Sequence, residues 1–571
     1  MVGALTPRSL ARLVTVVYAA TLILAVIVFQ PGCVSLVVWA SVEKSDLLRE
    51  VAARYEQTRP SEDLRCVKID VQRVASGDAE DMLARSGGTP GAMPDIWSPA
   101  ASTWVRLLER HRAIAGAPAI IPVSETRILQ SPLVIAMPEP MAVALGWPRA
   151  EISWKDIFAL ARDPVGWSTR GHPEWGRFKL AKTNPLISTS GLHALAATYV
   201  MSGGPSIQDP QVVAFMKSVE ESVVHYSNTV SSFLLNLAES DARGQALSYV
   251  SAIAMAEKEV WDYNQGNPES KTRPTRLPPE TKLVAVHPSE GTLLADHPFV
   301  VMPWVADEQK RRAAGHFLDH LRSDAVQQEF MSVAFRGARG ETGKPIDEST
   351  ELNRFKPSIY FAPLDPRTLA EVQSSWSSYR KRAQVLLMLD SGLSMADRIA
   401  PAVASKLDLA KDAWTAALDS LVSDDDVGLW ALAGIERRKL VDVGPLRDQR
   451  GTMRTELAAL TPRGSGKALY SAITEGVALL RQRFARDRIN AVVLLTDGRN
   501  DDVANTSLVD LLRALQAQAE DARVRVFTIA YGPAADRDAL ERIARAGRGA
   551  FYDATDPGVI NRVIRDAVSS F

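Results

Sequence analysis

The chain of 571 residues has only two cysteines, eight histidines and almost no net charge. Because 66 Lys plus Arg face 67 Asp plus Glu without a long basic run, the sequence gives no indication of nucleic-acid binding. The histidines have no neighbouring cysteine, nucleophile-elbow serine or HExxH spacing. We therefore expect a binding protein and not an enzyme. The alternative is a cell-wall hydrolase that uses Glu174 and Glu290 as a carboxylate pair.

Charge is also absent from one long apolar segment, residues 13–29, which follows Arg8 and Arg12. Positive charge before such a segment predicts a cytoplasmic N-terminus and an external remainder. The segment is slightly shorter than the roughly 20 residues that span a bilayer. Three interpretations stay open: an uncleaved transmembrane helix that makes a single-pass membrane protein, a lipoprotein signal ending at Cys33, and a cleaved signal peptide. All three place the bulk of the chain outside the cell.

Outside the cytoplasm the two cysteines can pair. Cys33 opens one apolar run and Cys66 opens another, with a helical stretch between them. In a parallel β-α-β unit the two strand starts can lie side by side, so we expect a Cys33 to Cys66 disulfide. Two free thiols in the core are the alternative.

The length predicts more than one hydrophobic core, and alternating apolar runs and helical stretches predict an α/β fold. We expect a membrane anchor or signal segment at residues 1–33, one domain at 34–360, a linker at 361–382 and a second domain at 383–571. In the first domain strands are predicted at residues 35–40, 67–71, 95–97, 132–137, 282–287 and 299–302.

In the second domain, strand and helix alternate as in a doubly wound, Rossmann-like sheet. One apolar strand stops at Asp390-Ser-Gly-Leu-Ser394 and another stops at Thr496-Asp497-Gly498. These loops, with RGSGKALYSAI at residues 463–473 between them, resemble the von Willebrand factor type A domain. The resemblance covers roughly the last 190 residues and implies a module for protein-protein interaction, through which an unknown protein partner would bind.

The resemblance also implies a metal-ion-dependent adhesion site, in which Mg²⁺ is held by carboxylates and hydroxyls. Asp390, Ser394 and Asp497 match its ligands, but Gly392 stands in place of a serine and Lys467 in place of a threonine. Mg²⁺ needs near-octahedral oxygen ligands, so this site is degenerate. Our hypothesis is that the Lys467 ammonium replaces the metal between the two carboxylates. The alternative is a weak Mg²⁺ site, and no cofactor is certain.

The first domain resembles the bacterial extracellular solute-binding proteins, the two-lobed periplasmic-binding type (type 2), in the actinobacterial form that is fused to a type A domain. The segments that carry this resemblance include PDIWSPAASTW at residues 94–104 and KTNPLISTSGLHAL at 182–195. A small solute is expected in a cleft between the lobes, where polar groups follow strand ends and open helices. The candidate ligand-binding residues are Ser41, Ser76, Trp97, Ser98, Thr183, Asn184, Ser188, Thr189, Ser190 and Glu290.

Together these features predict a membrane-anchored extracytoplasmic binding protein that combines a solute cleft with a protein-interaction module. Two more specific functions stay open. The chain is either the substrate receptor of an ABC importer or an envelope adhesion or assembly scaffold whose cleft is vestigial.

Overall fold

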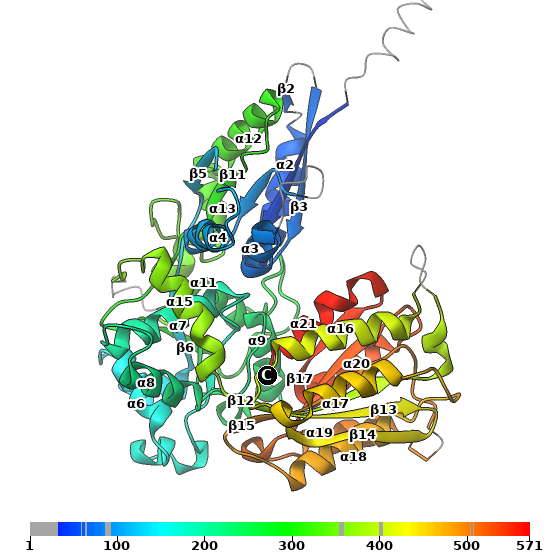
Figure 1. The fold of residues 1–571 in the computed structure, drawn as a ribbon. Helices are drawn as coiled ribbons and strands as arrows, with labels where there is room; N and C mark the ends of the chain where they lie inside the picture. The colour runs from blue at the N-terminus through cyan, green and yellow to red at the C-terminus, as the bar shows by residue number, and fades with distance from the viewer. Residues whose placement is uncertain are drawn as a thin grey trace, which may run out of the picture.

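The computed structural model describes residues 32–571 except 59, 63–64, 86–92, 121, 353–358, 399–403, 503 and 506. The apolar segment at residues 13–29 lies outside this part, so its expected membrane anchoring has no structural description. In the described part, no helix is both long and apolar enough to span a bilayer. The described chain forms two α/β lobes and a C-terminal α/β domain beside them (Figure 1).

Lobe 1 is built on a six-stranded sheet in the order β2-β3-β1-β4-β11-β5. Its strands are β1 (Val34–Ala40), β2 (Ser61–Glu62), β3 (Arg65–Arg73), β4 (Ile96–Ser98), β5 (Ser124–Arg127) and β11 (Pro298–Val301). Its helices are α2 (Val42–Gln57), α3 (Ser76–Arg85), α4 (Ser102–Ile114), α12 (Glu308–Leu321) and α13 (Asp324–Ser332). The parallel pairing of β1 with β3 brings Cys33 and Cys66 to a Cα distance of 4.4 Å in the expected disulfide.

Lobe 2 has a five-stranded sheet in which β6 pairs with β8, β9 and β10, and β7 pairs with β8. Its strands are β6 (Ser131–Pro138), β7 (Leu180–Ala181), β8 (Ala252–Ala256), β9 (Leu283–Val286) and β10 (Leu294–Ala295). Its helical segments are α5 (Glu139–Ala144), α6 (Trp154–Arg162), η1 (Gly166–Arg170), η2 (Pro173–Trp175), α7 (Thr189–Ser202), α8 (Pro210–Glu220), α9 (Val230–Asp241), α10 (Ala246–Tyr249), α11 (Glu257–Asn264) and α14 (Lys344–Asp347). The chain crosses between the lobes from β5 to β6, from β10 to β11 and from α13 to α14.

The C-terminal domain has a six-stranded sheet in the order β14-β13-β12-β15-β16-β17. Its strands are β12 (Arg382–Asp390), β13 (Asp426–Ala433), β14 (Glu436–Pro445), β15 (Arg488–Thr496), β16 (Arg525–Tyr531) and β17 (Arg548–Ala554). Its helical segments are η3 (Leu393–Ala396), α16 (Lys406–Ser420), α17 (Leu446–Ala459), α18 (Leu469–Gln482), α19 (Leu508–Gln516), η4 (Glu520–Ala522), α20 (Arg537–Ala546), η5 (Pro557–Val559) and α21 (Ile560–Val568). Central strands such as β12 are continuous apolar runs because helices cover both sheet faces.

The sequence analysis did not predict the strands β14 and β17 or the helices α17 and α21 of this domain. The strand β14 pairs antiparallel with β13 and interrupts the expected alternation of strand and helix, and α17 follows it. The sequence of β14, ERRKLVDVGP, is charged and half exposed because it forms the edge of the sheet, so it lacks the apolar run of a central strand.

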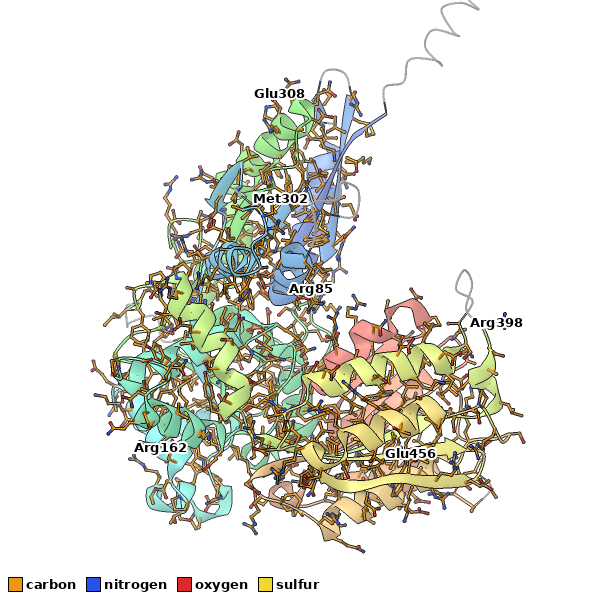
Figure 2. The ribbon with its side chains drawn as sticks, in the orientation of Figure 1. Arg85, Arg162, Met302, Glu308, Arg398 and Glu456 are labelled. Carbon is orange, nitrogen blue, oxygen red and sulfur yellow. A yellow bond between two sulfur atoms is a disulfide. The ribbon has the colours of Figure 1, made fainter. Side chains whose placement is uncertain are left out.

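The predicted linker contains a helix, α15 (Pro366–Tyr379), that packs on both lobes. It contacts α4 of lobe 1 and α7 and α8 of lobe 2. Trp376 lies edge-on to Tyr226 with ring centroids 5.0 Å apart, and Tyr226 in turn donates its N–H to Ser570 O of the C-terminal domain. In Figure 2, Met302 and Glu308 mark lobe 1, Arg162 marks lobe 2, and Glu456 marks the C-terminal domain. The linker helix is therefore part of the packed molecule.

Candidate functional site

The lobes enclose a polar cavity at the N-terminal turns of several helices. Serine or threonine residues line it at the starts of α2, α3, α7 and α9, and Ala256 lines it just before α11. The first N–H groups of a helix lack acceptors within the helix, and the helix dipole favours oxygen or negative charge there. Only about 50 Å³ of the cavity is wide enough for water, which leaves room for a few water molecules. The lobes are closed in this structure.

Half of the candidate ligand-binding residues lie on this wall. Helix α3 begins at Ser76, and the hydroxyl of Ser76 accepts from the N–H of Ala100 at 3.0 Å. The hydroxyl of Thr189, at the start of α7, accepts from Trp104 Nε1 of lobe 1 at 2.8 Å. The candidates that line the cavity are Ser41, Ser76, Ser188, Thr189 and Ser190.

The other five candidates do not line the cavity. Each of them is part of the protein interior or of a hydrogen bond with a neighbouring residue. Trp97 is a core residue, 1% exposed. Ser98 Oγ donates to Pro298 O at 2.8 Å, and Thr183 Oγ1 donates to Ser188 Oγ at 2.9 Å. The Asn184 side chain accepts from Leu186 N at 2.9 Å, and Glu290 accepts from Trp154 N at the start of α6 at 2.9 Å. These five residues support the walls.

Two carboxylates that the sequence analysis did not select, Glu43 and Glu259, also line the cavity. Burial, and then the charge of Glu43, raise the pKa of Glu259 to about 8. Glu43 Oε1 accepts from Ser41 Oγ at 2.5 Å and lies 3.4 Å from His297 Nδ1. Acidic residues are common in the first turn of a helix, so the sequence gave no reason to select these two. They form a pair only because the two lobes close on each other. By contrast, Glu174 is exposed and pairs with His172 outside the cavity.

Direct contacts between the lobes hold the cavity closed. Gly77 N, on α3 of lobe 1, donates to Ile187 O of lobe 2 at 2.9 Å. A Cβ atom at Gly77 would lie 2.1 Å from Leu186 O and 2.6 Å from Ile187 Cα, both backbone atoms of lobe 2. No real Cβ contact is this short. The closed arrangement of the lobes therefore requires a glycine at this position, and α3 itself shows no other need for one.

The second site lies at the carboxyl ends of β12 and β15 in the C-terminal domain. Asp390 and Asp497 are both 1% exposed there. The Lys467 ammonium donates to Asp390 Oδ2 and, at 2.7 Å, to Asp497 Oδ1. Burial opposes the charged form of Lys467, but the two carboxylates outweigh it and raise the pKa of the ammonium. The lysine therefore stays charged between them.

A second ammonium, that of Lys406, completes this site and was missed in the sequence. It opens α16 and donates to Asp497 Oδ2 at 2.8 Å and to Asp397 Oδ2 at 3.0 Å. Ser394 Oγ donates to Asp497 Oδ1 at 2.8 Å, and Thr496 Oγ1 donates to Asp390 Oδ2. Burial opposes ionisation of Asp497, but the hydrogen bonds from Lys406, Lys467 and Ser394 lower its pKa below the ordinary value. In the sequence, the one indication that Lys406 belongs to the site is its position at the start of a helix, twelve residues after Ser394.

The glycine at 392 and the lysine at 467 fit each other. A Cβ atom at Gly392 would lie 3.3 Å from Lys467 Nζ and 3.2 Å from Asp390 Oδ1, tighter than ordinary contact. A Cβ atom at Gly498 would lie 2.3 Å from Lys467 Cε. Both glycines make room for the lysine side chain, so the arrangement is built around an ammonium.

Two lobes around a polar cavity, with a further α/β domain whose strand ends carry paired carboxylates, define a two-lobed binding protein that carries a second interaction module. The chain belongs to the family of bacterial extracellular solute-binding proteins, whose model matches residues 36–336. The model of the von Willebrand factor type A domain matches residues 402–566.

Solved structures match both parts. A periplasmic thiamin binding protein is 12% identical, with a TM-score of 0.42, over 61% of this chain and 97% of its own. The periplasmic binding protein AfuA from Actinobacillus pleuropneumoniae, with fructose-6-phosphate bound, is 15% identical, with a TM-score of 0.41, over 62% of this chain and 100% of its own. A von Willebrand factor type A protein from Catenulispora acidiphila is 20% identical, with a TM-score of 0.27, over 33% of this chain and 42% of its own. A search of curated proteins gives no match.

Proposed function

We propose that this protein is an extracytoplasmic receptor, anchored to the membrane by its N-terminal segment, that closes on a small polar solute and presents its type A domain to a protein partner. The observation that carries the proposal is the closed interlobe cavity, whose walls bring helix N-terminal turns and hydroxyls from both lobes together. Because the walls come from both lobes, a bound solute stabilises the closed form over an open one.

The two carboxylates in the cavity narrow the class of solute. Glu259 and Glu43 lie close enough that the charge of one raises the pKa of the other. A solute with a cationic or hydrogen-bond-donating group would satisfy both carboxylates, while its oxygen atoms would accept from the hydroxyls and helix N-terminal amides. The small cavity favours a compact solute.

The type A domain is connected to the cavity by its last helix, α21. Asn228, which lines the cavity, donates to Asp566 O of α21 at 3.4 Å, and its side-chain oxygen accepts from Ser569 Oγ. On the other side, Arg565 of α21 lies 3.8 Å from Asp81 of α3 in lobe 1. Opening the lobes separates α3 from α21, so the position of the type A domain depends on the state of the cleft.

The partner face of the type A domain is proposed to work without metal. The ammonium groups of Lys406 and Lys467 already satisfy the carboxylates that a metal ion would bind. Two exposed apolar side chains flank the site, Leu393 at 57% and Ile435 at 72% exposure. Both side chains belong to the loops that form this site. Leu393 N donates to Gly464 O, and Ile435 follows Gly434, which forms a β-bridge with Lys467. An apolar protein surface is the expected complement.

The test of the receptor function is to prevent closure without touching the cavity. In Gly77→Ala the new methyl group meets the backbone of lobe 2, so we expect an increased radius of gyration in X-ray scattering. The matched control is Gly315→Ala in α12, where a Cβ atom meets nothing within 4 Å. The control should keep the wild-type radius and gain up to about 1 kcal/mol of stability from helix propensity.

A thermal-shift screen of sugars, amino acids and small cations on the full chain then tests solute binding. A hit that stabilises wild type and Gly315→Ala, but not Gly77→Ala, supports the receptor. A screen without hits, together with an unchanged radius in Gly77→Ala, would leave the scaffold with a vestigial cleft as the better description. The narrow cavity is the observation that favours that second function. Co-purification of a permease with the wild type would identify the receptor as part of an ABC importer.

A further inference from the structure

A second cavity, distinct from the interlobe cleft, lies between lobe 2 and the type A domain. Its volume is about 300 Å³. Lobe 2 contributes residues 161–179 and 221–224 in part, and the type A domain contributes residues that surround the starts of β15 and β16. Eight Arg or Lys residues and four Asp or Glu residues line it, so its wall carries an excess of positive charge.

The excess is greatest in the deepest part of the wall. Arg523 and Arg525 are 5% and 6% exposed, and Arg548, directly behind them, is 2% exposed. One carboxylate, Glu520, pairs with Arg523 at 2.9 Å and with Arg548 at 3.3 Å. Within the described residues Arg525 has no carboxylate partner. It donates to the backbone oxygen of Arg548 at 2.7 Å, and burial lowers its pKa to about 10.

One further cationic group on this wall, Lys381, lacks an anionic partner in the described structure. The Lys381 ammonium donates to two backbone oxygens of lobe 2, Val223 O at 2.9 Å and Glu221 O at 3.1 Å. Burial, and then the charge of Arg525, lower the pKa of Lys381 to about 8. The buried Nε of Arg523 has no hydrogen-bond partner in the described structure. Buried cations normally have carboxylate partners, so this wall is incomplete without an anion.

We propose that this cavity binds a multivalent oxyanion, a phosphoryl group above all, between Arg525, Arg523 and Lys381. Guanidinium groups bind phosphate oxygens through paired N–H donors, and the lysine adds a point charge. The volume exceeds that of a single phosphate, so the phosphoryl group of a small organic molecule also fits. Because the wall comes from both lobe 2 and the type A domain, the bound anion holds the two bodies together.

The experiment is calorimetric titration of the full chain with inorganic phosphate and with glycerol 3-phosphate, at constant ionic strength set with chloride. We expect saturable binding to the wild type and at least tenfold weaker binding to Arg525→Gln and to Lys381→Met. Arg486→Gln removes an exposed cation of the same wall and should weaken binding two- to fivefold with little risk to folding. The matched control, Arg513→Gln, removes an exposed arginine of the same domain outside the cavity and should bind as wild type does.

The ratio of the two affinities separates the sources, since tighter glycerol 3-phosphate binding indicates an organic phosphate and the reverse indicates the free ion. The proposal is overturned if the wild type binds neither probe, or if all three cavity variants bind as tightly as the wild type. Gly77→Ala distinguishes it from the receptor function. Phosphate binding that disappears in Gly77→Ala, but survives in Lys381→Met and Arg486→Gln, would belong to the cleft and would also overturn the proposal.

Discussion

The interlobe cavity and the strand-end site of the type A domain both bring two carboxylates together, but in the type A site both carboxylates have ion pairs, whereas in the cavity Glu259 has none in the described structure. Asp390 and Asp497 have two ammonium groups between and beside them. Glu259 faces Glu43 with no ion pair of its own in the described structure, and its pKa rises accordingly. A pair of carboxylates that already has its counter-charge is complete as a structure, whereas a buried carboxylate without an ion pair, such as Glu259, can still gain free energy from a ligand.

Removing the counter-charge from the type A site should have the strongest effect on the protein. Lys467→Met leaves two buried carboxylates with Lys406 as the remaining cation, and we expect a loss of about 3–5 kcal/mol in the free energy of unfolding. Urea denaturation measures it. Lys411→Met, which removes a lysine paired with the exposed Asp408, should cost at most about 1 kcal/mol. Equal losses in the two variants would show that the central ammonium does not hold the site.

At the cleft the corresponding change is Glu259→Gln, which removes the charge and keeps the shape. The pKa of Glu259 in the folded protein, about 8, lies above the ordinary glutamate pKa of 4.5. The stabilisation from its protonated form is therefore full below about pH 4.5 and is lost as the pH rises through 8. We expect the variant to exceed wild-type stability by about 2 kcal/mol at pH 9 and to equal it near pH 4. Parallel pH profiles of thermal unfolding in the two proteins would contradict this.

The type A site can also be given the hydroxyl ligands that a metal ion would need. Lys467→Thr combined with Gly392→Ser removes the central ammonium and adds two hydroxyls beside Asp390 and Asp497. We expect the double variant to bind Mn²⁺ at least tenfold more tightly than wild type, an effect of about 1.4 kcal/mol, in calorimetric titration. The single variant Gly392→Ser serves as the control and should gain nothing, because its side chain meets Lys467. Tight Mn²⁺ binding by the wild type would refute the metal-free site.

The smallest expected effect concerns the connection between the two regions. Asn228→Ala removes the contacts of a cavity residue with α21 and should lower stability by about 1 kcal/mol. It should also increase hydrogen exchange in α21. Ser218→Ala, which removes a hydroxyl bonded only within α8, is the control and should leave exchange in α21 unchanged. Unchanged exchange in Asn228→Ala would mean that the cleft and the type A domain are independent.

The sequence predicted the α/β class because buried strands are continuous apolar runs that need no tertiary information. The two-lobed and type A folds were predicted from the resemblance to their families, and the disulfide from the two cysteines at the starts of neighbouring strands. The strand-end carboxylates were also predictable, since the motif places them on neighbouring strands. Glu43, Glu259 and the closure contact at Gly77 were not, because they depend on how two lobes approach each other. Lys406 was missed for the same reason, as it reaches Asp497 from another element.

The position of the disulfide has a mechanical consequence. Cys33 immediately precedes β1, and its disulfide joins it to Cys66 at the start of β3. If the N-terminal segment anchors the chain as proposed, tension that arrives through it is shared at once by two adjacent strands of lobe 1. Peeling β1 away from its neighbour would first require a covalent bond to break, so a stretched tether would load the sheet as a unit and leave the cleft on its far side undisturbed.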